Sequence, residues 1–319
     1  MASKQIVCFG GGIGTKNLLK GLKKYTTDFT VVTSMADDGG SSGRLKRLYG
    51  MLPPGDIISC MASVGSSKFP EFSEYLTFRF PGDRYGDDSR LEGHKLGNLI
   101  LSAIFLKEKD FVKSIQKFQQ MFDIAGTYLP DTLEQTSLSA KIKSGKIIEG
   151  EENIELGKYR GDKVIEKLYL NPSSAKACPQ VIHKMKEADA LVVGPGDLYS
   201  NNISVLLVKE IANALISSKA KKFLIIDVAN KAFEAKNYSV SDYMEAFNRH
   251  LNVFPFQKVF VNNNFSVKIP HKFRSYEYVK DFGETSLSGF DVIRQDFLDE
   301  NFPLYHDSSK LAKAIAENI

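Results

Sequence analysis

The chain has 319 residues, of which 43% are hydrophobic and 25% charged. This ordinary globular composition excludes a disordered chain, a collagen-like repeat and a coiled coil. The 42 Lys and Arg residues against 38 Asp and Glu give a net charge of +4, an excess too weak to indicate a nucleic-acid partner. The three cysteines, an odd number and widely spaced, are typical of reduced thiols in a cytosol rather than of disulfides or a zinc site. No apolar run approaches the ~18–20 residues of a membrane-spanning helix, and Ile6–Phe9 is too short for a signal-peptide core. We therefore expect a cytoplasmic protein without a membrane span.

The first segment of the chain has the pattern of a parallel βαβ unit. Ile6–Phe9 is a short apolar run that ends at a glycine cluster, which is typical of a buried strand. Lys16–Tyr25 follows with leucines at helical spacing, and Phe29–Thr33 is a β-branched run. Strand, glycine turn, helix and strand within about 30 residues predict neighbouring parallel strands joined by a helix.

The same alternation returns in the second half of the chain. We predict strands at Ala190–Val193, Phe223–Val228, Lys258–Val261 and Asp291–Arg294, and helices at Ile203–Ser217 and Ser308–Ala316, the last capped by Asp307. Repeated units of this kind predict an α/β fold. It is a Rossmann-like, doubly wound, mostly parallel sheet with helices on both faces, three layers in all.

Ser139–Glu149 departs from this alternation. Two short runs flank the turn dipeptide Ser144-Gly145, which predicts a β-hairpin. We expect this hairpin to be an appendage in an insertion around residues 126–170. Because no linker, charge block or repeat marks a boundary, we expect residues 1–319 to form a single domain.

Three loops that follow predicted strands are rich in glycine. Ligands of open α/β sheets bind at such loops, where backbone N–H groups can approach a phosphate. The first loop supplies Gly10, Gly11, Gly12, Gly14, Thr15 and Lys16. It is neither a strict G-x-G-x-x-G nor a P-loop. We interpret it as a phosphate-binding turn with added positive charge from Lys16, and a tight turn without a ligand is the alternative.

The second loop combines acids, glycines and serines in a segment that we expect to be flexible. It contains Asp37, Asp38, Gly39, Gly40, Ser41, Ser42 and Arg44. Asp37 and Asp38 are candidate metal ligands, because Mg²⁺ takes one or two carboxylates together with substrate phosphates. They are also suited to accept hydrogen bonds from sugar hydroxyls. Arg44 is expected to hold a phosphate, and a solvated surface turn is the alternative.

A third loop and a later segment add candidate residues. The third loop supplies Gly194, Gly196 and Asp197, of which Asp197 has the alternative role of a helix cap. His94 and Asn98 are four residues apart on one predicted helical face. This suits His94 to acid–base work or a phosphate contact, and a structural histidine is the alternative. Asp56, by contrast, is interpreted as a helix N-cap. No zinc pair and no G-x-S-x-G elbow occurs.

Taken in chain order, these segments resemble one family. Five of them, in register, resemble the 2-phospho-L-lactate transferase (CofD-like) superfamily and, within it, the gluconeogenesis factor (YvcK-like) branch: Ile6–Gly14, Ala36–Arg44, Gly50–Ile57, Gly93–Leu101 and Gly194–Ser200. His306-Asp307 is similar too, so the resemblance spans nearly the whole chain. It departs at residues 228–235, where the branch usually carries Thr-Gln and then Gly-Glu-Thr, and at Tyr305, where a basic residue is usual.

The resemblance implies a nucleotide-binding cleft at the strand ends of a Rossmann-like sheet. Members of the gluconeogenesis factor branch bind UDP-sugars, notably UDP-N-acetylglucosamine, and are needed for cell shape and wall synthesis on gluconeogenic carbon sources. The resemblance therefore implies that this chain is a cytoplasmic nucleotide-sugar-binding regulator that links gluconeogenic carbon metabolism to cell-wall synthesis. A protein partner in cell-wall control is a hypothesis of the same origin, and a homo-oligomer stays open.

The transferase branch implies an alternative function. It moves a phospholactyl group from a nucleoside-diphosphate carrier with the help of Mg²⁺, so the alternative is a Mg²⁺-dependent transferase of phosphorus-containing groups. Asp37 and Asp38 are then the candidate catalytic residues. A dehydrogenase that uses a dinucleotide is a third hypothesis, which the interrupted glycine motif disfavours.

Overall fold

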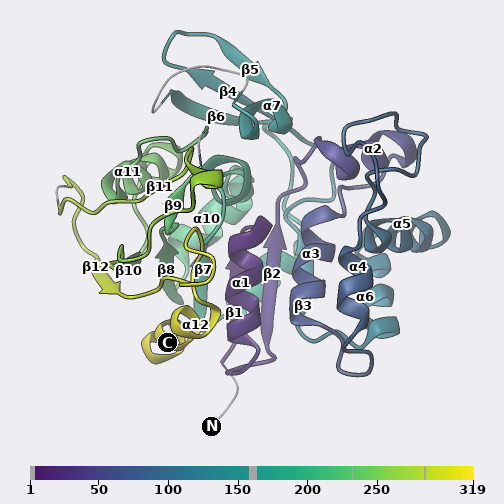
Figure 1. Ribbon diagram of the computed structural model, residues 1–319, viewed down its shortest axis with the longest axis horizontal. Coiled ribbons are helices and arrows are strands. Elements are labelled where there is room, and N and C mark those ends of the chain that lie inside the picture. The colour runs from purple at the N-terminus through teal and green to yellow at the C-terminus, as the bar shows by residue number, and fades with distance from the viewer. Residues whose placement is uncertain (1–3, 158–163, 232, 284) are drawn as a thin grey trace.

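The computed structural model describes residues 4–157, 164–231, 233–283 and 285–319. Within them the centre of the fold is a seven-stranded parallel sheet (Figure 1). Its strands are β1 (Ile6–Phe9), β2 (Phe29–Thr33), β3 (Thr127–Pro130), β7 (Ala190–Val193), β8 (Lys221–Ile225), β10 (Lys258–Asn262) and β12 (Asp291–Gln295). In space they lie in the order β12-β10-β8-β7-β1-β2-β3, and every neighbouring pair is parallel. The predicted doubly wound α/β fold is confirmed.

The order of the strands reverses at β1. The chain builds outward through β2 and β3, and then returns to place β7 on the other side of β1. At such a switch point the connections after two neighbouring strands leave toward opposite faces, and a crevice opens at the carboxyl ends of the strands. The loops after β1 and β7 are therefore the ones that position a ligand in this fold class.

Helices cover both faces of the sheet. Ile6 and Cys8 pack in one core with α1 (Gly12–Leu22), α3 (Gly55–Val64) and α12 (Ser308–Asn318). Val7 and Phe9 pack in the other core with α8 (Pro179–Glu187), α10 (Lys209–Ser217) and α11 (Val240–Leu251). The alternation follows from the two-residue period of a strand. It explains why β1 is apolar at every position, since it is buried on both faces.

A further group of helices lies on the β3 side of the sheet (Figure 1). They are α2 (Gly40–Tyr49), α4 (Phe72–Thr77), α5 (Leu96–Glu108) and α6 (Phe111–Phe122). The prediction that residues 36–44 form a flexible loop is wrong from Gly40 onward, because this segment forms α2 and the first turn of α2 is buried. Small residues permit that packing: a Cβ on Gly43 would lie 1.9 Å from the Asp38 carbonyl oxygen.

Two other expectations about helices are wrong. His94 and Asn98 do not share a helical face, because α5 begins at Leu96 after the extended residue Lys95. The single helix expected at 203–217 is divided into a π-helical turn (Leu198–Ile203), α9 (Ser204–Leu206) and α10. The division falls at Val208, whose backbone is extended.

A small antiparallel sheet stands apart from the central one, at the top of Figure 1. β4 (Ser137–Ile142) pairs with β5 (Ile147–Glu149) as the predicted hairpin, and β6 (Ile165–Asn171) adds a third strand on the other side of β4. α7 (Glu151–Glu155) follows β5. Of the predicted insertion, residues 127–130 belong to the central sheet as β3, and residues 158–163 lie outside the described part.

A pair of short strands and a 3₁₀ turn complete the described fold. β9 (Ala229–Asn230) pairs with β11 (Glu277–Tyr278), and a 3₁₀ turn spans His271–Phe273. Across the described ranges, no helix combines the length and the apolar character needed to cross a membrane.

Candidate functional site

The glycine loops after β1 and β7 lie against each other at the switch point. Thr15 Oγ1 donates a hydrogen bond to the Pro195 carbonyl at 3.0 Å, and Asn202 Nδ2 donates to the Gly196 carbonyl at 2.7 Å. A Cβ on Gly14 would lie 2.7 Å from the Pro195 carbonyl oxygen, so the absence of a side chain permits this approach. Thr15 therefore joins the two loops.

A cavity of about 260 Å³ opens beside these loops, near the lower end of the size range of ligand pockets. Among the predicted site residues it is lined by Gly12, Gly14, Lys16, Asp37, Gly196 and Asp197. Other predicted residues shape the loops without lining the cavity: Gly10, Gly11, Thr15 and Gly194. Asp56, which was interpreted as a helix cap, lines the cavity too. Further charged lining residues were not among the predicted site residues: Arg79, Arg84, Lys95, Glu151, Glu155, Asp227 and Lys231.

Half-buried carboxylates hold the backbone of both loops. The Gly12 N–H donates to Asp56 Oδ1 at 3.1 Å, and the Gly196 N–H donates to Asp227 Oδ1 at 3.0 Å. Burial raises the pKa of Asp56 and of Asp227, and these N–H groups oppose that effect. The interpretation of Asp56 as an N-cap is wrong, because Pro54 occupies the cap position of α3. Asp56 instead holds the N-terminus of α1.

Cationic side chains from separate elements converge on the cavity. Lys95 Nζ donates to Ser59 Oγ at 2.7 Å, and burial lowers the pKa of Lys95 to about 8 against the opposing effect of Asp56. Burial also lowers the pKa of Lys16. Arg79 Nη1 donates to Ser41 Oγ at 3.2 Å and to the Gly93 carbonyl. Ser41 thus positions a cavity cation.

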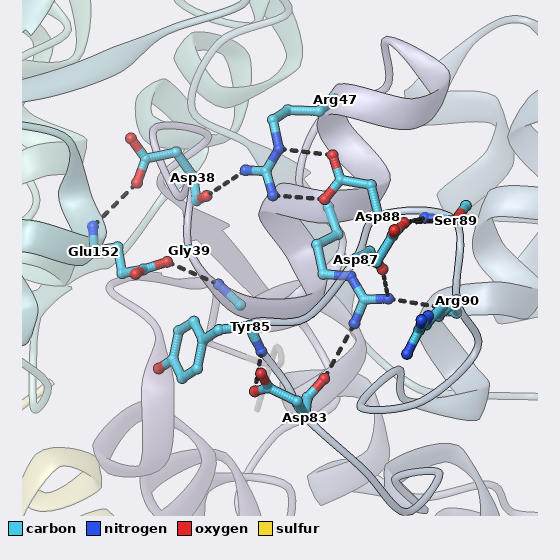
Figure 2. A network of polar contacts seen from close by, with 12 residues as sticks. Asp38, Gly39, Arg47, Asp83, Tyr85, Asp87, Asp88, Ser89, Arg90 and Glu152 are labelled. Carbon is cyan, nitrogen blue, oxygen red and sulfur yellow. Dashed lines mark hydrogen bonds and ion pairs between the residues drawn. The ribbon is translucent and has the colours of Figure 1, made fainter.

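Arg44 does not line the cavity, so it does not have the expected position for a phosphate contact. It holds a neighbouring segment of the chain instead. Its buried guanidinium donates to the carbonyl oxygens of Glu92 at 2.7 Å and Asp83 at 3.3 Å, and also to those of Asp87 and Arg90. Next to it, Arg47 forms paired hydrogen bonds with Asp88 (Figure 2). These bonds fix the segment 83–92, which carries the cavity residue Arg84.

The side chains of the neighbouring residues Asp37 and Asp38 lie in different surroundings. Asp37 lines the cavity, and burial, with Asp56 as a further cause, raises its pKa to about 7. Asp38 Oδ1 accepts the N–H of Glu152 at 3.0 Å, while Glu152 Oε2 accepts the N–H of Gly40 at 3.3 Å (Figure 2). Asp38, Gly39 and Gly40 therefore fasten α7 to this loop.

The residues present do not fit the expected Mg²⁺ site. Asp37 Oδ1 accepts the N–H of Gly39 at 2.9 Å, whereas Asp38 Oδ1 accepts the N–H of Glu152 in α7, so the two carboxylates are held by different partners. Within the described ranges, no group of three or more His, Cys, Asp or Glu side chains could hold a metal ion. Another acidic pair at the cavity, Asp197 and Glu155, is bridged by Lys231. We therefore assign no metal-dependent step to these residues.

Three further predicted residues lie behind the cavity lining. Ser42 is buried in α2 against α3, where a Cβ on Gly55 would lie 2.1 Å from its Oγ. His94 is buried, and burial lowers its pKa. Asn98 is buried in the first turn of α5, and neither atom of its amide has a hydrogen-bond partner among the described residues. None of the three lines the cavity.

The pKa shifts of the lining acids weaken the negative charge of the cavity. Burial raises the pKa of Asp37, Asp56, Glu151 and Asp227, which shifts all four toward their neutral forms. Arginine side chains stay charged in proteins. Burial also lowers the pKa of Lys16 and of Lys95, whereas Arg79 and Arg84 keep their charge, so the cavity presents fixed positive charge beside acids whose negative charge is weakened. A ligand that carries phosphate groups suits this balance.

A parallel sheet with a glycine-lined, charged cavity at its switch point is the architecture of Rossmann-like α/β proteins. The family model for 2-phospho-L-lactate transferase CofD matches residues 6–298, and the chain belongs to this family.

Proteins with a more specific name are similar over nearly their whole length. The gluconeogenesis factor of Bacillus subtilis strain 168 is 33% identical over 322 residues, which cover 98% of this chain and 97% of that protein. The gluconeogenesis factor of Listeria innocua is 33% identical over 316 residues, with 98% and 94% covered. A crystal structure of a UPF0052 family member from Bacillus halodurans has 29% identity and a TM-score of 0.89, with 99% of each chain covered.

Proposed function

We propose that the chain is a cytoplasmic regulator that binds a nucleotide-sugar of the UDP-N-acetylglucosamine type and links gluconeogenic carbon metabolism to cell-wall synthesis and cell shape. The observation that carries this proposal is the position of the charged cavity beside the glycine loops after β1 and β7. The name of the similar proteins, gluconeogenesis factor, supports the metabolic context.

In this proposal the cationic side chains of the cavity bind the diphosphate, and its acidic side chains bind the sugar hydroxyl groups. Lys16, Arg79, Arg84 and Lys95 supply ammonium and guanidinium donors, and guanidinium suits phosphate because it can donate two parallel hydrogen bonds. Asp37 and Asp197 supply oxygens that accept hydrogen bonds from hydroxyl groups.

Calorimetric titration with UDP-N-acetylglucosamine and with GDP tests this proposal. The wild type is expected to bind the UDP-sugar, and Lys16→Met is expected to weaken binding at least about tenfold, because a hydrogen bond to a charged group contributes about 1.5–3 kcal/mol. Lys20→Met is the matched control, since Lys20 lies one turn further along α1 and does not line the cavity. Absence of binding of either nucleotide at millimolar concentration would contradict the proposal.

A second function, transfer of a phosphorus-containing group from a nucleoside-diphosphate carrier, is favoured by the match to the transferase family. Mass spectrometry of protein incubated with a nucleoside-diphosphate-linked substrate and an acceptor distinguishes the two. An enzyme forms a product that Asp37→Asn abolishes, whereas a binding protein forms no product even as the wild type.

A further inference from the structure

Lys231 bridges two acidic side chains at the cavity. Its Nζ lies 3.1 Å from Glu155 Oε1 and also contacts Asp197 Oδ2. Glu155 ends α7, Asp197 follows β7, and Lys231 follows β9. One ammonium group therefore joins three segments that are distant in the sequence. All three residues line the cavity.

The surroundings keep this ammonium group charged. Burial opposes its charge, but Asp197, Glu155 and Glu234 together hold the pKa of Lys231 well above its ordinary value. A lysine ammonium has three N–H donors, and the contacts with Asp197 and Glu155 use two of them. The side chain is 27% exposed, so a ligand in the cavity can approach the third.

The two carboxylates around the Lys231 ammonium group match the protein part of a magnesium site. Mg²⁺ is usually bound by one or two carboxylates, and phosphate oxygens and waters complete its shell. Asp197 and Glu155 form such a pair of carboxylates. We propose that Lys231 is a resident cation that takes the place of a divalent metal ion between Asp197 and Glu155, and that it excludes such an ion from the cavity.

Titration of the purified protein with Mn²⁺ alone, followed by electron paramagnetic resonance of the free ion, tests this inference without any nucleotide. The wild type is expected to show no Mn²⁺ site that depends on Asp197. Lys231→Met removes the ammonium and keeps a side chain of similar length, so it is expected to bind Mn²⁺ at least about tenfold more tightly, because two nearby carboxylates lose their counter-ion.

Matched variants separate this effect from a general loss of charge. Lys231→Arg keeps a cation and is expected to behave as the wild type. Lys141→Met removes a lysine that pairs with Glu166 outside the cavity, at 3.0 Å, and is expected to leave Mn²⁺ affinity unchanged. Circular dichroism establishes that each variant is folded.

Two results would overturn the inference. One is a Mn²⁺ site in the wild type that Asp197→Asn removes. The other is a folded Lys231→Met protein with the Mn²⁺ affinity of the wild type. Where Lys231→Met does not fold, Lys231→Gln gives the same comparison, and the titrations of the wild type and Asp197→Asn stand without any change at Lys231.

Discussion

Gly14 is a residue at which α1 packs closely against the loop after β7. It lies in the first turn of α1, and a Cβ there would meet the Pro195 carbonyl oxygen at 2.7 Å and the Gly196 nitrogen at 2.9 Å. Two effects of Gly14→Ala oppose each other. Alanine favours a helix by about 1 kcal/mol over glycine, whereas forcing extra volume into a packed site typically costs about 1–3 kcal/mol.

We expect the steric effect to exceed helix propensity, because the contacted atoms belong to backbone that cannot rotate away. Gly14→Ala is therefore expected to lower the free energy of unfolding, measured by urea denaturation. Lys20→Ala, an exposed change on the same helix, is expected to stay within about 0.5 kcal/mol of the wild type. A stabilised Gly14→Ala protein would show that the two loops do not pack as described.

Some individual roles could be predicted from the sequence and others could not. Asp307 was predicted as the cap of the last helix, and its carboxylate accepts the N–H groups of Ser309 and Lys310. This prediction succeeds because capping is local. The roles of Arg44 and Arg79 are not local: Arg44 donates to a segment about 40 residues later, and Arg79, for which no role was predicted, lines the cavity and contacts Ser41. No spacing in the sequence records such contacts.

At the scale of elements, α2 and the segment 83–92 depend on one buried side chain. Arg44 from α2 donates to four carbonyl groups of this segment. Arg44→Leu leaves those carbonyl groups without their donor. We expect it to reduce stability by at least about 2 kcal/mol and to speed amide hydrogen exchange across 83–92.

Arg47→Leu is the matched control from the same helix. It removes an ion pair with Asp88, in which the two side chains are 53% and 36% exposed, and an exposed hydrogen bond to the Asp38 carbonyl at 3.1 Å, so a cost of about 0–1 kcal/mol is expected. Hydrogen exchange measured by mass spectrometry distinguishes the two variants. Equal exchange of the segment in both would contradict the role given to Arg44.

The elements differ in how well the sequence predicts them. The strands β1, β2 and β7 have their predicted bounds, because each is a continuous apolar or β-branched run buried on both faces. β6 was not predicted, although Ile165, Leu168 and Leu170 are buried and the residues between them are not. Its partner is β4 from the earlier hairpin, so the pairing depends on contacts that a scan of neighbouring residues does not detect.

At the scale of the whole molecule, the two hydrophobic cores extend over nearly the full sequence. The core on the α1 face joins residues from Ile6 to Ile315, and the other joins residues from Val7 to Val279. Because each core includes strands from both sides of the switch point, neither half of the sheet can be separated without exposing apolar surface. We therefore propose that the chain is one domain.

Buried ionisable groups give the whole molecule a pH-dependent stability. Burial raises the pKa of Asp131 and of Glu234 to about 8, from ordinary values of 3.8 and 4.5. Burial lowers the pKa of His250 and of His306 to about 4, from 6.5. Between about pH 4 and 6.5 the two effects oppose each other, because the native state holds extra protons on the carboxyl groups and lacks them on the histidines.

From pH 6.5 to about 8 only the carboxyl effect changes. The folded protein keeps protons that the unfolded chain has already released, so the free energy of unfolding falls as the pH rises, by at most about 1.4 kcal/mol per pH unit for each group. Thermal unfolding followed by circular dichroism is expected to show a Tm that decreases between pH 6.5 and 8. Asp131→Asn, which resembles the protonated carboxyl group in shape and is neutral at every pH, is expected to make this decrease shallower. A Tm that rises over this interval would mean that Asp131 and Glu234 are ionised in the native protein and are stabilised by their hydrogen bonds instead.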